Sequence, residues 1–174
     1  MFFKINPMSK KSCFVFRIIT TFPSYHKRAG EETNFVEMIK QGTKKHTIVV
    51  KYDHWKKICK LVDENKAYIS LRIWEGVACR SSTIEIMRLH RKQKVGIESL
   101  EITDFDIFVD NKKYVTFEEL AEGEGLSVKD FKDLIQKHDL SKTLGIFHFK
   151  STKYTKVRKK YDLKKNKQNY EKTK

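Results

Sequence analysis

The sequence is poor in residues that would cross-link or anchor a chain. Its 174 residues include three cysteines, Cys13, Cys59 and Cys79. An odd number leaves one cysteine without a disulfide partner, and the distances between them in the sequence match no common disulfide motif. We therefore expect reduced thiols in a cytoplasmic protein rather than a disulfide framework. No long apolar run precedes the lysines at positions 10 and 11. We therefore expect neither a signal peptide nor a membrane span.

Two kinds of ligand-binding motif are also missing. The six histidines form no H-E-x-x-H sequence and no close pairing with cysteine, so the usual metal-site spacings are absent. Gly123 and Gly125 flank a glutamate, but they lack the lysine and the preceding strand that a phosphate-binding loop requires. We therefore expect no metal site and no cofactor.

Positive charge is what the sequence has in excess, with a net charge of +15. Residues 150–174 hold eleven lysines or arginines against Asp162 and Glu171, so this segment alone carries +9. Its only aliphatic residues are Val157 and Leu163, too few to offset the entropy of ordering. We expect a disordered or frayed basic tail, which either solubilises the protein or contacts nucleic-acid phosphates without sequence specificity.

This charge boundary divides the chain into three parts. We expect an N-terminal extension at 1–11, one domain at 12–149 and the basic tail at 150–174. A content of 39% apolar residues supports one sizeable core but hardly two at this length. We expect the protein to be a monomer.

The central part alternates short helices with strands. Capping residues predict helices that begin after Asn34, Asp53, Thr116 and Ser127. Apolar alternation and β-branched runs predict strands at 13–20, 47–50, 68–74, 84–89, 96–102 and 144–149, with a hairpin of 105–109 and 114–117 turning at Asp110-Asn111. Because strands and helices do not alternate as βαβ units, we expect an α+β fold, specifically a small mixed β-barrel or curved sheet with flanking short helices.

The stretch from Phe35 to Val50 is the most informative. An apolar stripe predicts a helix that ends at Gly42, and the run from Thr47 to Val50 predicts a strand directly after it. Lys44 and Thr47 lie at this junction of helix and strand, where side chains often line the edge of a cleft.

These residues carry a resemblance to a known family. The pattern G-x-K-x-x-T-I, here Gly42, Lys44, Thr47 and Ile48, resembles the opening motif of the activating-signal-cointegrator homology (ASCH) domains of the PUA-like superfamily. The sequence AEGEGLS at 121–127, followed by Phe131, is similar to the segment in which that family's glutamate precedes a short C-terminal helix. Residues 24–35 and 71–81 look more like a little-characterised phage and bacterial branch of PUA-like proteins. The resemblance covers roughly residues 13–149.

The resemblance implies a PUA-like barrel and two functions. ASCH proteins that act as amidohydrolases on N4-acylated cytidine nucleosides have a catalytic set that matches Lys44, Thr47 and Glu124. A threonine hydroxyl needs a neighbouring base, and the tetrahedral intermediate needs a cation or donor facing its oxyanion. We assign Glu124 as the base or a hydrogen-bond partner of the substrate and Lys44 as the electrostatic stabiliser. PUA-like domains in general bind RNA or modified nucleobases.

The sequence departs from the family pattern at two places. Val49 stands where ASCH domains commonly carry an arginine, and the helix after Asp53 fills the region of a Gly-Asp turn. The missing charge would come from elsewhere, with Lys51, Arg72 or Arg80 as candidates.

A second group of residues suits recognition of RNA or a nucleotide. Aromatic rings stack on bases, guanidinium groups reach phosphates or base edges, and glycine permits a close backbone approach. In an alternative interpretation, the aromatic residues simply pack under a helix and the arginines are solvated. The candidates are Tyr25, His26, Arg28 and Gly30 in one loop and Arg72, Trp74 and Arg80 on and after a strand with a polar face.

Two hypotheses follow. In the first, a basic barrel cleft binds RNA or a modified nucleobase, helped by the tail. In the second, the same cleft hydrolyses an amide of a modified nucleoside. We favour binding, because the missing arginine weakens the enzyme hypothesis and the basic tail calls for a polyanion.

Overall fold

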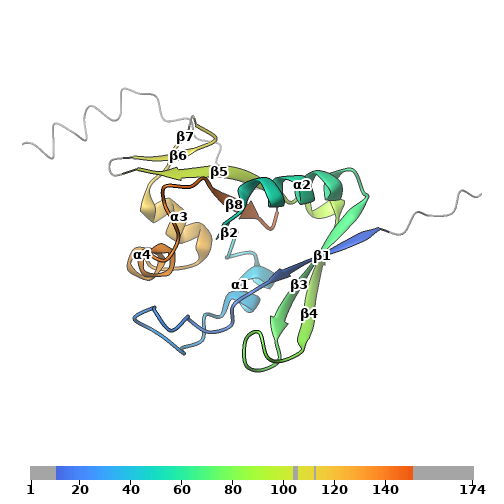
Figure 1. The fold of residues 1–174 in the computed structure, drawn as a ribbon, viewed down its shortest axis with the longest axis horizontal. Coiled ribbons are helices and arrows are strands. Elements are labelled where there is room, and N and C mark those ends of the chain that lie inside the picture. The colour runs from blue at the N-terminus through green and yellow to red at the C-terminus, as the bar shows by residue number, and fades with distance from the viewer. Residues whose placement is uncertain (1–10, 104–105, 112, 151–174) are drawn as a thin grey trace, which may run out of the picture.

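The computed structural model describes residues 11–103, 106–111 and 113–150, which form a mixed α+β structure (Figure 1). The predicted α+β class is therefore confirmed. No helix in these ranges is long and apolar enough to cross a membrane. In chain order the elements are β1 (Ser12–Arg17), α1 (Phe35–Gln41), β2 (His46–Val49), α2 (Tyr52–Asp63), β3 (Ala67–Trp74), β4 (Thr83–Leu89), η1 (Arg91–Gln93), β5 (Gly96–Ile102), β6 (Ile107–Val109), β7 (Lys113–Tyr114), α3 (Phe117–Glu124), α4 (Val128–Ile135) and β8 (Leu144–His148).

The strands form two sheets. In the first, β3 lies between β1, to which it is parallel, and β4, to which it is antiparallel. The second is antiparallel throughout and has the order β2-β8-β5-β6-β7. Within the described residues neither sheet closes on itself. The predicted PUA-like barrel is therefore not confirmed, and the strands make two open sheets.

The two sheets and α2 share one hydrophobic core. Phe16 and Leu71 come from the first sheet, Phe147 from β8 of the second, and Val62 from the apolar stripe of α2. Fully burying side chains of this size stabilises the fold by about 1.5–3 kcal/mol each. The helix α2 thereby packs against β3 of the first sheet and against β5 and β8 of the second (Figure 1).

A second core lies under α3 and α4. Leu120 of α3 and Phe131 of α4 pack with Leu100 of β5 and Ile146 of β8. Successive residues of a strand point to opposite faces, so Ile146 enters this core while Phe147 enters the first one. The strand β8 is buried along its whole length and holds the two cores together.

Local sequence signals position most of these elements. Gly42 ends α1 with a left-handed φ of 80°, as predicted. The predicted capping box of α3 is confirmed, because the Thr116 hydroxyl accepts a hydrogen bond from the Glu119 N–H and the Glu119 carboxylate accepts one from the Thr116 N–H. Ser127 caps α4, also as predicted. The turn between β6 and β7 lies at the predicted position, with positive φ at Asp110 and Asn111.

One predicted N-cap residue lies at the predicted position without a capping hydrogen bond, and a second predicted N-cap is wrong. Asn34 has a left-handed φ of 57°, and its side chain makes no capping hydrogen bond to α1. The hydroxyl of Thr33 accepts from the Phe35 N–H instead, at 3.4 Å. Lys51, with a φ of 60°, precedes α2, so Asp53 lies in the first turn of that helix rather than at its cap.

Two of the three predicted parts of the chain lie largely outside the residues that the structure describes. The N-terminal extension lies outside it up to residue 10, and the basic tail from residue 151 onward. Lys150, the first residue of that tail, is exposed.

Candidate functional site

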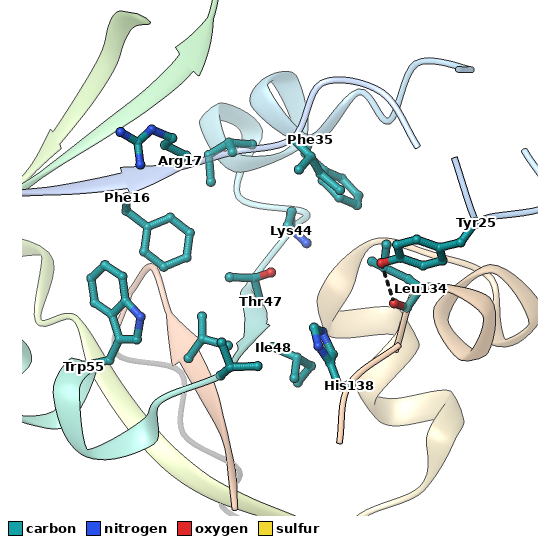
Figure 2. Close-up of a pocket in the computed structure, with 14 residues that line it drawn as sticks. Phe16, Arg17, Tyr25, Phe35, Lys44, Thr47, Ile48, Trp55, Leu134 and His138 are labelled. Carbon is teal, nitrogen blue, oxygen red and sulfur yellow. Dashed lines mark hydrogen bonds between the residues drawn. The ribbon is translucent and has the colours of Figure 1, made fainter. Parts of the chain in front are cut away.

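A cleft of about 340 Å³ opens where β1, an edge strand of the first sheet, faces β2, an edge strand of the second (Figure 2). Segments distant in the sequence form its walls, since the loop after β1, the start of α2 and the end of α4 all contribute. The lining residues are Phe16, Arg17, Ile18, Ile19, Tyr25, Phe35, Lys44, Thr47, Ile48, Val49, Val50, Trp55, Leu134 and His138.

Aromatic rings form two sides of this cleft. Phe16 and Trp55 lie with ring centroids 4.8 Å apart. Phe35 and Tyr25 lie on the other side of the cleft (Figure 2). Tyr25 is 36% exposed, and its hydroxyl donates a hydrogen bond to the Leu134 carbonyl at 3.1 Å. Flat apolar surfaces of this kind suit a planar ligand that inserts between them.

A buried ion pair lies at the floor of the cleft. The amine of Lys44 bonds the carboxylate of Glu124 and also donates to the Glu124 backbone carbonyl at 2.9 Å. Both side chains are 1% exposed. The second carboxylate oxygen of Glu124 accepts from the backbone N–H of Ile48 in β2. Glu124 thus joins the end of α3 to the strand that carries Thr47.

The environment of Lys44 changes its acid–base behaviour. Burial lowers the pKa of the Lys44 amine, because desolvation disfavours its charged form, while the Glu124 carboxylate opposes this shift. The amine also lies 3.9 Å from the centroid of the Phe35 ring. A lysine whose pKa is lowered has a larger neutral fraction near neutral pH, which is the form that can accept a proton.

The predicted set Lys44, Thr47 and Glu124 is brought together by the fold. Figure 2 shows the Lys44 amine and the Thr47 hydroxyl pointing toward the same part of the cleft. The Glu124 carboxylate does not line the cleft and has both oxygens engaged. This geometry favours Lys44, rather than Glu124, as the group that meets a ligand.

The loop residues of the second predicted group mainly fasten the loop to α4. His26 is buried, and its Nδ1 accepts from the Arg28 N–H, so its Nε2 donates to the Asp130 carbonyl at 3.0 Å. Arg28 pairs with Asp130 and Glu31. Gly30 has a φ of 83°, with open space around it. Of these four loop residues, Tyr25 lines the cleft.

The other three members lie elsewhere. Arg72 and Trp74 belong to β3, and Arg80 is exposed in the turn between β3 and β4. None of the three lines the cleft between the sheets. Arg72 donates to the Thr83 carbonyl at 2.8 Å. The structure therefore separates the residues that the sequence grouped as one surface.

Several residues that line the cleft were not predicted, and His138 is one of them. It follows α4 and points into the cleft between Ile48 and Leu134 (Figure 2). Burial lowers the pKa of His138, and the charge of Glu124 opposes this. His138 lies in the turn after α4, so helical spacing gave no signal that would have identified it. Arg17, Phe16 and Trp55 gave no signal that distinguished them from ordinary sheet and core residues.

A buried histidine pair lies behind this site. His46 of β2 and His148 of β8 have ring centroids 5.7 Å apart, and His148 bonds Glu98 at 2.7 Å. His46 Nε2 lies 3.2 Å from the Leu120 carbonyl, and a Cβ added at Gly123 would lie 1.9 Å from the His46 ring. Gly123 therefore allows α3 to approach β2 closely enough for Glu124 to bond Lys44 and the Ile48 N–H.

We expect His46 to make stability sensitive to acid. Burial, then His148 and Lys44, lower the pKa of His46 to about 3, while Glu98 opposes the shift. The unfolded chain, with a histidine pKa of about 6.5, takes up a proton first as the pH falls. The stability that neutral His46 contributes is therefore present above pH 6.5 and lost toward pH 3. Between pH 7 and 5 the expected loss is about 2 kcal/mol.

Urea unfolding at both pH values, on the wild type and on His46→Gln, checks this expectation. The variant should lose about 2 kcal/mol less than the wild type between pH 7 and 5. The exposed His54 offers a matched control, since His54→Gln should keep the wild-type dependence. An equal loss in the wild type and in His46→Gln would show that another group governs the acid response.

Comparisons with known proteins give no assignment. No family model, no curated protein and no solved structure matches this chain. Within the described ranges, no three His, Cys, Asp or Glu side chains gather as a metal site.

Proposed function

We propose that the cleft between the two sheets binds one nucleobase, either of a free modified nucleoside or of a residue in RNA. The observation that carries this proposal is the pairing of aromatic walls with a small set of convergent polar groups. In this proposal a planar base inserts between Tyr25 and Phe35 on one side and Trp55 and Phe16 on the other, all of which line the cleft. Such stacking contributes about 1–3 kcal/mol per base.

The polar groups are suited to the edge of a base. The amine of Lys44 donates, the Thr47 hydroxyl donates or accepts, and the His138 ring does either according to its tautomer. A volume of about 340 Å³ lies in the range of sites for small ligands. Arg17 adds a positive charge at the rim, where a phosphate of a nucleotide would lie.

The convergence of Lys44, Thr47 and Glu124 also supports the resemblance to ASCH domains. These residues are up to 80 positions apart, yet they meet in one place. We therefore propose that the two open sheets are a variant of the PUA-like fold. The loss of the family arginine at Val49 is offset in this proposal by Arg17, from the opposite wall.

Titration calorimetry with N4-acetylcytidine tests the binding proposal. We expect saturable binding by the wild type and weakening of about tenfold or more in Tyr25→Ala, which removes a stacking wall. Tyr52→Ala, at the start of α2 and outside the cleft, is the matched control and should bind as the wild type does. No heat and no shift in unfolding temperature at millimolar nucleoside would contradict the proposal.

A second candidate function, amide hydrolysis, is favoured by the lowered pKa of Lys44 beside the Thr47 hydroxyl. The Thr47 oxygen attacks the acetyl carbon while its proton passes to Lys44 in the fraction of molecules in which that amine is neutral. The C–N bond then breaks, and the leaving N4 nitrogen takes that proton to give cytidine. Water hydrolyses the threonine ester, releases acetate and restores the hydroxyl. Glu124 positions Lys44 in this scheme and does not contact the substrate.

A further inference from the structure

The outer face of the first sheet carries an ordered array of arginines and aromatic rings. The register places Arg17 of β1 beside Arg72 of β3, and Ser70 beside Arg88 of β4. The alternate residues, such as Leu71, point inward and are buried. The array, here called the arginine face, consists of Arg17, Tyr68, Arg72, Trp74 and Arg88.

Two of the three arginines of this face, Arg17 and Arg88, lie against aromatic rings. The Arg17 guanidinium is 4.9 Å from the Trp74 ring centroid, and that of Arg88 is 5.3 Å from the Tyr68 centroid. Such pairs hold the guanidinium in place while leaving its N–H groups able to bond. The geometry is therefore set before any ligand binds.

The face has an excess of positive charge. The three strands, all within the described residues, contain the arginines of this face and one acidic residue, Glu85. Glu85 accepts from the Ser70 hydroxyl at 2.5 Å and from Arg88 at 2.6 Å, and the register places it beside Arg72, so it offsets part of the charge of both arginines. Val15, 41% exposed, is the adjoining apolar residue on β1. Charge of one sign with stacked rings favours a polyanion with exposed bases over an apolar protein partner.

The arginine face is continuous with the cleft. β1 is the edge strand of the first sheet, and Arg17 both lines the cleft and stacks on Trp74. Figure 2 shows Arg17 and Phe16 on opposite sides of β1, with Phe16 inside the cleft. A strand that crosses the face therefore passes over β1 at the point where one of its bases can turn into the cleft.

We propose that the arginine face binds single-stranded RNA that flanks the nucleobase held in the cleft. This inference rests on the proposed function, and the strand is RNA because the proposed cleft ligand is a ribonucleoside. Arg17, Arg72 and Arg88 contact phosphates, and Tyr68 and Trp74 offer ring edges and faces to adjacent bases. A duplex does not fit this scheme, because its bases already stack on one another.

Fluorescence anisotropy with a labelled nine-nucleotide RNA that carries a central cytidine tests this proposal on the full chain. In Arg72→Gln/Arg88→Gln we expect at least tenfold weaker binding and a slope of log K against log salt reduced by about 1.4, for two lost phosphate contacts. Lys57→Gln/Lys60→Gln removes the same charge from α2, on the other side of the sheet, and should leave both quantities unchanged. Arg72→Lys/Arg88→Lys keeps the charge and should restore the slope with part of the affinity.

The outcomes separate this inference from the cleft proposal. Free N4-acetylcytidine should bind the wild type and Arg72→Gln/Arg88→Gln equally, because neither arginine lines the cleft. If that double variant binds RNA with the affinity and the salt slope of the wild type, the proposal that the arginine face binds RNA is wrong. Equal affinity for DNA of the same sequence would overturn the assignment to RNA. Binding of RNA that depends on these arginines, with no binding of the free nucleoside, would contradict the cleft proposal instead.

Discussion

Replacing Glu124 by alanine is expected to destabilise the protein by about 3–5 kcal/mol, because it leaves a buried lysine without its counter-charge. Lys44 and Glu124 are each 1% exposed, so water cannot take the place of the lost carboxylate. The substitution also leaves the Ile48 N–H without its acceptor. Urea unfolding at pH 7 measures this loss.

A double variant separates the ion pair from the packing around it. Lys44→Met/Glu124→Gln removes both charges and keeps an acceptor for the Ile48 N–H, so it should recover most of the stability lost in Glu124→Ala. Glu122→Ala removes an exposed carboxylate of the same helix and should leave stability unchanged. A Glu124→Ala protein as stable as the wild type would show that the pair is not buried in solution.

Thr47→Val is expected to abolish hydrolysis of N4-acetylcytidine while nucleoside binding persists. The variant has nearly the same shape and lacks the oxygen that attacks the acetyl carbon, and loss of a nucleophile typically lowers turnover by about a thousandfold or more. Chromatography of released cytidine measures the rate, and calorimetry on the same protein measures binding.

Thr43 supplies the matched control for this experiment. It is exposed, bonds the Met38 carbonyl and lies outside the cleft, so Thr43→Val should keep full turnover. Hydrolysis that survives in Thr47→Val would remove Thr47 as the nucleophile. A wild type that binds the nucleoside without hydrolysing it would leave the cleft as a binding site and reject the second candidate function.

Local signals in the sequence predicted most of the elements but not their assembly. Gly42, Thr116 and Ser127 act within one turn of chain, so their effects can be read directly from the sequence. Asn34 holds the N-cap position of α1 without a capping hydrogen bond, and Asp53 lies inside α2 rather than at its cap. In both cases the residue just before the helix adopts a left-handed backbone conformation. Closure of a barrel depends on how far separate strands shift and tilt, which no local pattern records.

The candidate site shows the same division. The meeting of Lys44, Thr47 and Glu124 was predicted from a family resemblance, since residues 44 and 124 give no local sign of contact. Trp55 was missed because an ordinary helical stripe predicts burial without saying which residue borders a cavity. His138 was missed because it lies in a turn outside any helical stripe. Arg28 and His26 were predicted as ligand-binding, yet the structure engages them with α4, whose acidic residues lie about a hundred positions away.

The most direct test of the cleft proposal is NMR chemical-shift mapping of the full ¹⁵N-labelled chain during titration with N4-acetylcytidine. We expect the largest shifts on backbone amides at 16–19, 47–50 and 134–138, which line the cleft from three sides. An absence of shifts at saturating nucleoside, or shifts confined to the separate groove formed by 51–54 and 142–144, would contradict it.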